Sequence, residues 1–356
     1  PPSSAAPLPD PPFAATPVRA TSSVRAPRAI RIRTRDHRAV TDRILIVGAS
    51  WVGDMVMAQP LLARLRAAAP QSPIDVLAPA WVLPIVRRMP EVADLVVSPF
   101  GHGTLDLRGR WRLARDLARR GYGQAVLLPN SIKSALVPWL AGIPRRTGFL
   151  GEHRHGLVND VRRFDPVAVP RLVDRFLLLG DGPAVEPLPR LVCDPSSRDA
   201  LLTRLGVDLA RPVACLCPGA EYGPAKRWPV RHFGELVRRL DAAGFAVWLM
   251  GSAKDAPVAD EIRAAAGGAG HVLAGRTDLG EAADLLACAR VVVSNDSGLM
   301  HVAAAVGRPV VALFGSSSPD YTPPLSPLAR IVRNPVPCSP CFQRVCPLGH
   351  FACLEE

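Results

Sequence analysis

Short apolar runs alternate with longer amphipathic stretches over most of the chain, at a spacing of roughly 20–30 residues. Apolar runs of four to eight residues are typical of buried parallel strands, and the stretches between them have helical spacing. In the first half we expect strands at 43–48, 74–80, 93–100 and 143–149, helices at 55–70, 82–90, 111–121 and 171–180, and a strand, polar turn and helix within 124–142. Pro60 should kink the first of these helices.

The second half repeats this alternation. We expect strands within 212–220, 245–252, 271–275, 291–293 and 310–314, and helices at 198–205, 230–244, 256–267, 279–289 and 299–306. Repeated strand–turn–helix units predict an α/β protein with doubly wound parallel sheets. A proline-rich stretch between Asp181 and Arg190 predicts a linker, which gives domains 41–185 and 186–356 after an N-terminal extension, 1–40.

One stretch, 291–316, combines a strand, a tight polar turn, a helix and a second strand. Its turn falls at the carboxyl end of the predicted sheet, where ligands of open α/β sheets bind. A helix N-terminus presents free N–H groups to anions, so phosphate is the first ligand to consider. Two structural alternatives stay open: Asn295, Asp296 and Ser297 could simply cap the helix, and His301 could be a buried histidine with its hydrogen bonds satisfied.

Composition narrows the class of protein. The chain has 356 residues, a net charge of +12 and no apolar run of about 18 residues, the length that a membrane-spanning helix needs. Residues 1–40 carry seven arginines and two aspartates, lack any helical or strand period and predict a disordered extension. The positive charge favours anionic partners, either a membrane surface or nucleic acid. Only three of the 43 basic residues are lysines: Lys133, Lys226 and Lys254.

The glycine fingerprint G-x-G-x-x-G is absent, which argues against a nicotinamide dehydrogenase. Instead, four segments in order resemble the ADP-heptose:lipopolysaccharide heptosyltransferases, glycosyltransferases of the two-domain GT-B fold. They are ILIVGASWVGDMVMAQPLL, LCPGAEYGPAKRWP, VSNDSGLMHVAAAVGRPVVALFGSSSP and CSPCFQRVCPLGH. Within the family, the second and fourth segments resemble heptosyltransferase II. The resemblance implies two Rossmann-like domains facing each other across a cleft, the first binding acceptor and the second ADP-heptose.

An inverting transfer needs a base near the acceptor hydroxyl and a group that neutralises the leaving diphosphate. Asp54, after Gly53 at the mouth of the first helix, is the candidate base; its alternative is a carboxylate that favours the helix dipole. The family's proposed catalytic base matches Asp54. Lys226, in a loop directly after a strand, is the candidate for the leaving group, and Arg227 beside it either assists or is solvated.

The remaining candidates follow from the same turns. The N–H groups of Ser297, Gly298 and Leu299 would complete the anion site, with Asp296 holding the turn and His301 donating to an oxygen. Further donor-binding candidates are Gly219 in the donor loop, Asp255 for ribose hydroxyls and Leu279 beside the adenine, and the acceptor candidates are Ser131 and Lys133. A solvated loop charge for Asp255 and a solvated helix start for Ser131 and Lys133 stay open. We expect no metal and no cofactor in the reaction.

The eight cysteines form two groups. Cys193, Cys215, Cys217 and Cys288 lie in apolar segments and are predicted to be buried core thiols. Cys338, Cys341, Cys346 and Cys353 cluster with His350 near the C-terminus, where zinc is an alternative to reduced structural thiols. The second pair lacks the usual short zinc spacing, so reduced thiols are the expectation.

The expected function is therefore transfer of L-glycero-D-manno-heptose from ADP-heptose to the inner-core heptose of lipopolysaccharide. Heptosyltransferase I or III, with another core acceptor, is the alternative within the family. A basic nucleic-acid-binding protein is the alternative of another class, but the three tyrosines and ten phenylalanines are not clustered with basic residues as that function requires. We expect a cytoplasmic enzyme at the inner face of the inner membrane, with ADP-heptose and a Kdo-lipid A acceptor bearing heptose as partners and no nucleic acid.

Overall fold

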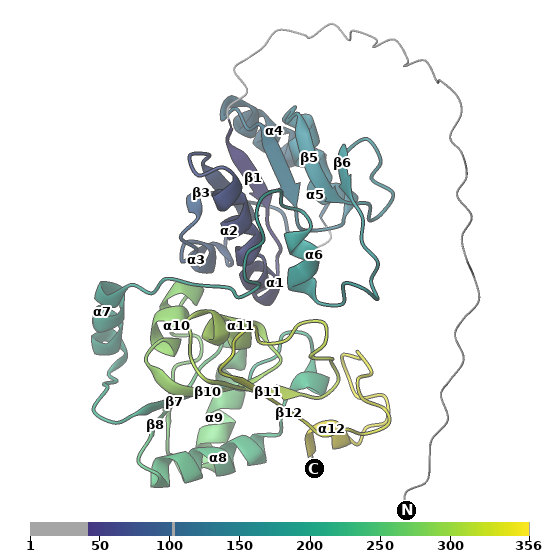
Figure 1. The fold of residues 1–356 in the computed structure, drawn as a ribbon. Helices are drawn as coiled ribbons and strands as arrows, with labels where there is room; N and C mark the ends of the chain where they lie inside the picture. Colours follow the sequence, from purple (N-terminus) through teal and green to yellow (C-terminus); the bar gives the residue numbers. More distant parts are fainter. Residues whose placement is uncertain (1–41, 102–103, 356) are drawn as a thin grey trace, which may run out of the picture. The chain divides into compact units, whose positions relative to one another are not determined.

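The computed structural model describes residues 42–101 and 104–355. The extension predicted at 1–40 lies outside these residues. In the described part, two parallel six-stranded sheets with flanking helices confirm the predicted α/β class (Figure 1). Both sheets belong to one compact unit.

The first sheet has the spatial strand order β3-β2-β1-β4-β5-β6. Its strands are β1 (Ile44–Val47), β2 (Ile74–Pro79), β3 (Val92–Ser98), β4 (Gln124–Leu127), β5 (Arg145–Phe149) and β6 (Asp160–Arg162). Its helices are α1 (Val52–Met57), α2 (Gln59–Ala68), α3 (Leu83–Val86), α4 (Leu107–Arg119), α5 (Ile132–Leu140) and α6 (Leu172–Leu177). The central strands β1 and β2 are buried along their whole length, as the continuous apolar sequence of β1 requires. In β2 the buried Asp75 accepts hydrogen bonds from Arg43 and Tyr122.

The second sheet has the order β12-β11-β10-β7-β8-β9. Its strands are β7 (Val213–Cys217), β8 (Ala246–Leu249), β9 (His271–Val272), β10 (Ala289–Asn295), β11 (Val310–Phe314) and β12 (Ala329–Arg333). Its helices are α7 (Pro195–Leu205), α8 (Val230–Ala242), α9 (Ala256–Ala265), α10 (Leu279–Leu286), α11 (Gly298–Ala305) and α12 (Ala352–Glu355), with short 3-10 turns at η1 (Pro224–Lys226) and η2 (Ala253–Asp255).

The two sheets have the same topology. When the strands of each sheet are numbered 1 to 6 along the chain, both sheets have the spatial order 3-2-1-4-5-6 of the doubly wound fold. The strand order reverses between β1 and β4 in the first sheet and between β7 and β10 in the second. Ligands of such sheets bind at the carboxyl ends of the strands beside the reversal, so the topology gives each half one expected binding position.

Several element boundaries differ from the sequence expectation. The helix expected at 55–70 begins at Val52 and breaks at Ala58 into α1 and α2, because Pro60 lacks the N–H that would continue the ladder. Helix α7 begins at Pro195 rather than at residue 198, with Asp194 as its N-cap. Strands β6 and β12 were not predicted, since both are short edge strands without an apolar run.

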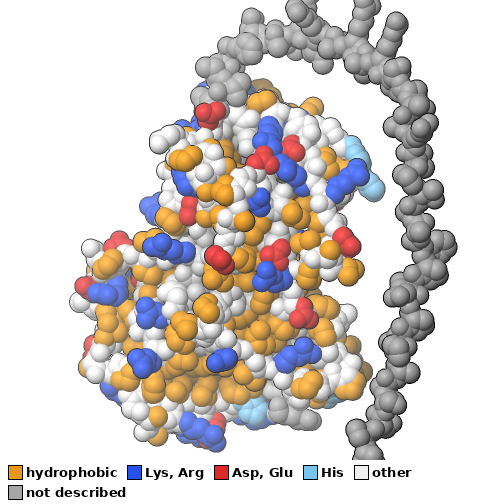
Figure 2. All heavy atoms as spheres, in the orientation of Figure 1, with side chains coloured by type: hydrophobic (Ala, Val, Ile, Leu, Met, Phe, Trp, Pro, Cys, Tyr) orange, Lys and Arg blue, Asp and Glu red, His pale blue; other side chains and the backbone are white. Residues whose placement is uncertain are grey.

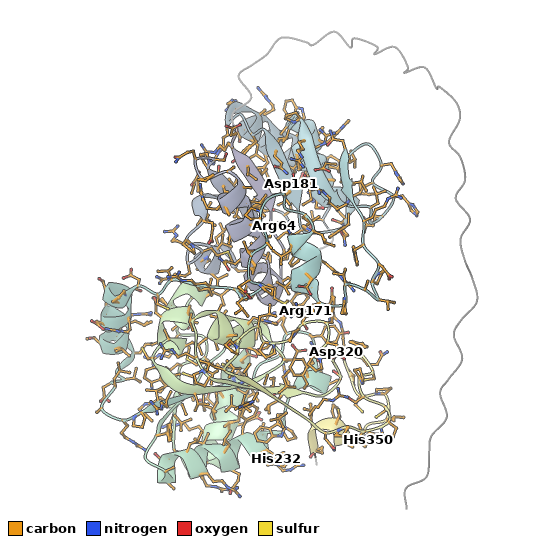
Figure 3. The ribbon with its side chains drawn as sticks, in the orientation of Figure 1. Arg64, Arg171, Asp181, His232, Asp320 and His350 are labelled. Carbon is orange, nitrogen blue, oxygen red and sulfur yellow. The ribbon has the colours of Figure 1, made fainter. Side chains whose placement is uncertain are left out.

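Contacts join the two halves along several elements. Helix α1 packs on α11, and α3 packs on α10. The Leu172 N–H donates to the Tyr321 carbonyl at 3.0 Å, next to Arg171 and Asp320, which are labelled in Figure 3. The stretch 181–190, predicted as a linker, contains no helix or strand.

Candidate active site

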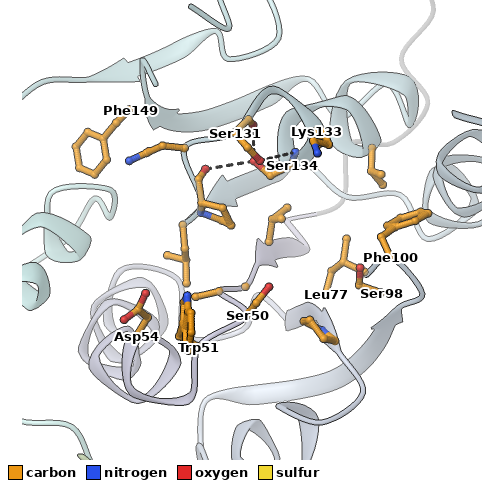
Figure 4. A pocket seen from close by; sticks show the side chains of 18 of the residues that line it. Ser50, Trp51, Asp54, Leu77, Ser98, Phe100, Ser131, Lys133, Ser134 and Phe149 are labelled. Atoms are coloured by element: carbon orange, nitrogen blue, oxygen red, sulfur yellow. Dashed lines mark hydrogen bonds between the residues drawn. The ribbon is translucent and has the colours of Figure 1, made fainter. Parts of the chain in front are cut away.

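A pocket of about 560 Å³ opens at the strand reversal of the first sheet. It contains the predicted base Asp54 and both predicted acceptor residues, Ser131 and Lys133. In Figure 4, Asp54 and Trp51 lie on one side of the pocket, and Ser131, Lys133 and Ser134 lie on the other. The structure therefore brings together three residues that the sequence separates by nearly 80 positions.

Asp54 is a carboxylate held in an unfavourable place for its charge. It lies in the first turn of α1, where the helix dipole favours a negative charge. Burial nevertheless raises its pKa from 3.8 to about 6, against an opposing effect of the positive charge on Lys226. No residue in the described ranges 42–101 and 104–355 donates a hydrogen bond to the Asp54 side chain. A poorly stabilised carboxylate with a pKa near neutrality is suited to accept a proton.

The opposite wall of the pocket is built by the start of α5. Ser131 is the N-cap of α5 and accepts a hydrogen bond from the Ser134 N–H at 3.3 Å. The buried Arg154 donates from Nη1 to the Pro129 carbonyl at 2.7 Å and to the Ser134 hydroxyl at 3.1 Å. Arg110, also buried, donates to the Lys133 carbonyl at 2.9 Å. Sequence reasoning missed both arginines, because neither motif nor spacing distinguishes them from the many exposed arginines.

Lys226 lies in η1, in the loop after β7. Its ammonium donates to Asp296 Oδ2 at 2.5 Å and lies 5.0 Å from the centre of the Tyr222 ring. Asp296 is buried and also accepts a 2.5 Å hydrogen bond from the Ser317 hydroxyl. The structure thus joins the two predicted diphosphate-binding segments through one ion pair. Asp296 and Lys226 are not part of the lining of the 560 Å³ pocket.

The turn after β10 is fixed to the end of β7. The Asn295 side chain donates from Nδ2 to the Pro218 carbonyl at 2.7 Å and accepts from the Trp228 N–H at 3.1 Å. This links the two strands at which the order of the second sheet reverses, and it also holds the lysine loop. The sequence placed Asn295 only among residues that could cap the helix.

The Ser297 hydroxyl does not cap α11; its oxygen lies 3.3 Å from the Ser294 hydroxyl instead. The N–H groups in the first turn of α11 therefore have no side-chain acceptor from their own N-cap. At this end Gly298 packs on α1, where an added Cβ would lie 2.9 Å from the Val52 Cβ. Leu299, the next residue of the predicted anion site, is half-buried.

His301 is buried against the segment that carries Asp54. A Cβ added to Gly53 would lie 2.7 Å from His301 Cδ2, so the imidazole rests directly on the α1 backbone. Burial lowers the pKa of His301 to about 4, opposed by the Asp296 carboxylate and assisted by the Lys226 charge. The ring is therefore neutral at physiological pH. Its Nδ1 is buried with no hydrogen-bond partner among the described residues, so the histidine is buried but not satisfied.

Two other predicted donor residues lie in contact. The Asp255 carboxylate lies 2.5 Å from the position that a Cβ on Gly219 would occupy, so only glycine fits at that position. Asp255 Oδ2 accepts from the N–H and hydroxyl of Ser252, at 2.9 and 2.8 Å, and closes a capping box at the start of η2, directly before α9. Asp255 therefore has a structural role in this turn, and ribose binding by its carboxylate stays a prediction.

The last predicted donor residues differ in their surroundings. Arg227 is exposed, and its guanidinium reaches the Ala220 carbonyl at 3.5 Å. Leu279 is the first residue of α10 and packs, half-buried, against the core. Tyr321, which no motif indicated, also lines the pocket. Burial raises the pKa of the Tyr321 hydroxyl, and the nearby charge on Asp54 raises it further.

The C-terminal cysteine segment braces the lysine loop. The Tyr222 hydroxyl donates to the Phe342 carbonyl at 2.6 Å, and the Ala225 N–H donates to the Arg344 carbonyl at 3.1 Å. Gly223 lies so close to this segment that an added Cβ would meet the Arg344 carbonyl oxygen at 2.4 Å. The sequence indicated this segment through its cysteines and its family resemblance, but not through any contact with the lysine loop.

All eight cysteines are free thiols. Cys215 and Cys217 are buried as predicted, whereas Cys193 and Cys288 are only half-buried, because they lie at the edges of the core beside Arg88 and Arg308. The other four line one small cavity together with His350, which is labelled in Figure 3. In the described part of the chain, no three Cys, His, Asp or Glu side chains are placed to hold a metal ion.

Comparison with known proteins identifies the class. The model of glycosyltransferase family 9 (heptosyltransferase) matches residues 110–352. The chain belongs to glycosyltransferase family 9. This glycosyltransferase is 47% identical over 305 residues to lipopolysaccharide heptosyltransferase 2 of Escherichia coli K12, covering 82% of this chain and 88% of that protein. It is 45% identical over 306 residues to lipooligosaccharide heptosyltransferase 2 of Haemophilus influenzae, with the same shares of 82% and 88%.

The fold agrees with the sequence match. The structure of E. coli ADP-heptose lps heptosyltransferase II superposes with a TM-score of 0.76 at 45% identity and covers 82% of this chain and 90% of that one. The GT-B arrangement that the motifs implied for this glycosyltransferase is confirmed. No helix in the described ranges has the length and apolar character to cross a membrane.

Proposed function

We propose that this glycosyltransferase transfers L-glycero-D-manno-heptose from ADP-heptose to the inner-core heptose of lipopolysaccharide. The observation that carries the proposal is the convergence of Asp54 and Lys226. They follow strands at the reversal points of two different sheets, yet the Lys226 charge acts on the pKa of Asp54. A base from one half and a cation from the other are thereby available to one transfer reaction. The high identity to relatives named heptosyltransferase 2 supports the choice of sugar and acceptor.

In the proposed reaction, Asp54 takes the proton from an acceptor hydroxyl as its oxygen attacks the anomeric carbon of the heptose. The bond from that carbon to the diphosphate oxygen breaks, and ADP leaves with the electron pair. Because the attack comes from the face opposite the leaving group, the configuration inverts. The raised pKa of Asp54 makes it a stronger base than an exposed aspartate while it is still mostly ionised at pH 7.

Negative charge develops on the diphosphate as this bond breaks. We assign its neutralisation to the Lys226 ammonium and to the N–H groups of Ser297, Gly298 and Leu299 at the start of α11. Asp296 holds the lysine in place at 2.5 Å, and Ser317 orients Asp296. His301, neutral and with an unpartnered ring nitrogen, is available to a phosphate oxygen or an ordered water.

The other predicted residues complete the two binding regions of this proposal. Gly219, Arg227, Asp255 and Leu279 would contact the nucleotide sugar in the second domain (186–356). Ser131 and Lys133 would contact the acceptor in the first domain (41–185), within the pocket that also holds Asp54. The acceptor is a glycolipid, so we place the enzyme on the cytoplasmic side of the inner membrane, bound peripherally.

The decisive experiment measures release of ADP from ADP-heptose with defined truncated lipopolysaccharide acceptors. An acceptor that ends in a single inner-core heptose should support turnover. A Kdo-lipid A acceptor without heptose should not, and activity on it would identify heptosyltransferase I chemistry instead. Turnover only on a more extended core would identify heptosyltransferase III chemistry. No turnover with any of these acceptors would refute the proposed function.

A further inference from the structure

Helix α4 has an outward surface that the proposed reaction does not use. Its inner side packs through the buried Ala114 and Leu117, and α4 lies against α5. Arg110 of α4 and Lys133 of α5 line the pocket, so this helix pair forms part of the pocket wall. On the side away from the core, arginines recur at helical spacing. They are Arg108, Arg112, Arg115 and Arg119.

Large apolar side chains are exposed among these arginines. Leu107 is 58% exposed and Trp111 is 52% exposed, one helical turn apart. Leu105, just before the helix, is 49% exposed. The Arg115 guanidinium lies over the Trp111 ring at 4.7 Å, which holds the indole on the surface rather than in the core. Three neighbouring apolar groups in water need an explanation that the fold does not give.

Arg119, in the last turn, pairs with Asp116 at 3.2 Å, whereas the arginines nearer the start of α4 lack acidic partners among the described residues. Within the described ranges, Arg108 and Arg112 form no ion pair or hydrogen bond with a side chain. Helix α8 in the second half is a useful comparison, since it also has 13 residues and a basic outer side. There, Glu235 pairs with Arg238 and Arg239, and none of the exposed large apolar residues belongs to α8. Figure 2 shows basic side chains over both halves, so charge alone does not single out α4.

We propose that the outer side of α4 docks on an anionic membrane surface. Unpaired arginines attract anionic phospholipids, while tryptophan and leucine partition into the headgroup region. The α4 surface consists of Leu105, Leu107, Arg108, Trp111, Arg112 and Arg115. Docking there would bring the side of the protein that carries this pocket wall to the bilayer in which a glycolipid acceptor is anchored, and in this respect the inference rests on the proposed function.

The test is sedimentation of the full chain with vesicles of phosphatidylcholine containing anionic phosphatidylglycerol, and with phosphatidylcholine alone. The variant Arg108→Glu/Arg112→Glu should bind anionic vesicles about 10-fold or more weakly, because each basic group near such a surface contributes about 5-fold. The matched control Arg238→Glu/Arg239→Glu makes the same charge change on α8 and should lose less than about 2-fold. Trp111→Ala should also weaken binding, without changing the charge on α4.

Three outcomes would overturn the inference: unchanged vesicle binding in the α4 variants, an equal loss in the α8 control, or wild-type binding that is equally strong without anionic lipid. Loss of binding to a DNA duplex with vesicle binding retained would assign the α4 surface to nucleic acid instead. Transfer to a short soluble acceptor separates this inference from the proposed function. The rate of this transfer should be unchanged in the α4 variants if the α4 surface serves only to bind membranes. If the wild-type protein does not catalyse the transfer, the proposed function is refuted, but the result of the vesicle experiment still stands.

Discussion

At the scale of single residues, burial decides the chemistry of the site more than residue type does. Asp54 occupies a helix first turn, which lowers a carboxylate pKa, yet the loss of solvent raises it to about 6. His301 shifts the other way, to about 4, because burial disfavours its cation. The aspartate is therefore the group of this pair that titrates near the physiological range.

Rate should depend on pH through Asp54. A base must be deprotonated, so we expect kcat/KM to fall as pH decreases through about 6. Asp54→Asn should reduce kcat by about 10²- to 10⁴-fold and leave ADP affinity nearly unchanged. Steady-state rates from pH 5 to 8, with ADP titration of the variant, check both points. An apparent pKa near 4, or a variant with more than half of wild-type turnover, would remove Asp54 from the role of base.

The same residue should weaken the fold at neutral pH. Its folded-state pKa of about 6 exceeds the unfolded value of 3.8, so its contribution to stability is present below pH 4 and is lost as pH rises through 6. Asp54→Asn should therefore raise the free energy of unfolding at pH 7.5 by about 2–3 kcal/mol, and by much less at pH 4. Denaturant titration at the two pH values measures this difference. Equal effects at both would show that Asp54 is not desolvated.

Lys226 should act on the rate more than on binding. Charge on the leaving oxygen grows toward the transition state, so an interaction with it strengthens there. Lys226→Ala should lower kcat more than it raises the KM for ADP-heptose, and Lys226→Arg should rescue poorly because a planar guanidinium does not replace a compact ammonium at Asp296. Steady-state measurements of kcat and of the KM for ADP-heptose in the two variants test this prediction. An effect confined to KM would make Lys226 a uniform binding residue.

At the scale of elements, the lysine loop depends on a segment more than 110 residues away in the sequence. The loop runs from η1 into α8 with glycine and proline, and by itself such a sequence has no fixed conformation. Its order comes from the cysteine segment through Phe342 and Arg344, and from Asn295 at the end of β10. The position of Lys226 is thus a property of three segments together.

Gly223→Ala tests this brace. The new methyl would meet the Arg344 carbonyl oxygen at 2.4 Å, which forces the loop away from the C-terminal segment. Gly244→Ala is the matched control, because Gly244 also has a positive φ, of 87°, but has no heavy atom within 4 Å of its added Cβ. Both variants should lose on the order of 1 kcal/mol from the backbone conformation, and only Gly223→Ala should lose turnover. Thermal unfolding and kcat of the two proteins distinguish the effects, and equal turnover in both would disprove the brace.

At the scale of the whole molecule, two sheets of the same topology belong to one compact unit, and the candidate residues Asp54 and Lys226 follow the strands beside their reversals. The halves are joined by apolar packing of α1 on α11 and by a buried ion pair, in which Arg88 of the first half donates to Asp284 of the second. The Asp284 side chain is completely buried and also accepts from the Asp194 N–H at 2.9 Å. Such a pair fixes how the halves meet, because moving one partner away would leave the other charge buried without a counter-ion or water.

Arg88→Ala should destabilise the protein strongly. Removing the guanidinium leaves the Asp284 carboxylate buried without its cation, which costs about 3–5 kcal/mol. Adding Asp284→Asn should restore part of the loss, because the remaining group is neutral. Chemical denaturation of the two single variants and the double variant measures the coupling. Strictly additive effects would show that the two side chains do not interact in solution.

The sequence alone determined the fold class of this protein and indicated the segments of its candidate site. Continuous apolar runs such as Ile44–Val47 can only be satisfied by sheets covered on both faces, so the alternation of elements was readable from local pattern. The positions of Gly53-Asp54 and Ser294–Gly298 could also be predicted, since polar turns that follow buried strands fall at one edge of a sheet. Edge strands β6 and β12 were not predicted, because an exposed strand needs no apolar run.

Tertiary structure alone decided how these groups act on one another. No local pattern indicates that Asp296 pairs with Lys226, that His301 rests on Gly53, or that Arg154 holds the pocket wall. Each of these contacts joins segments that are distant in the chain, and each depends on which strands become neighbours. The pKa of Asp54 is the clearest case. Its sequence position predicts a stabilised carboxylate, whereas burial raises its pKa to about 6, as the proposed role of base requires.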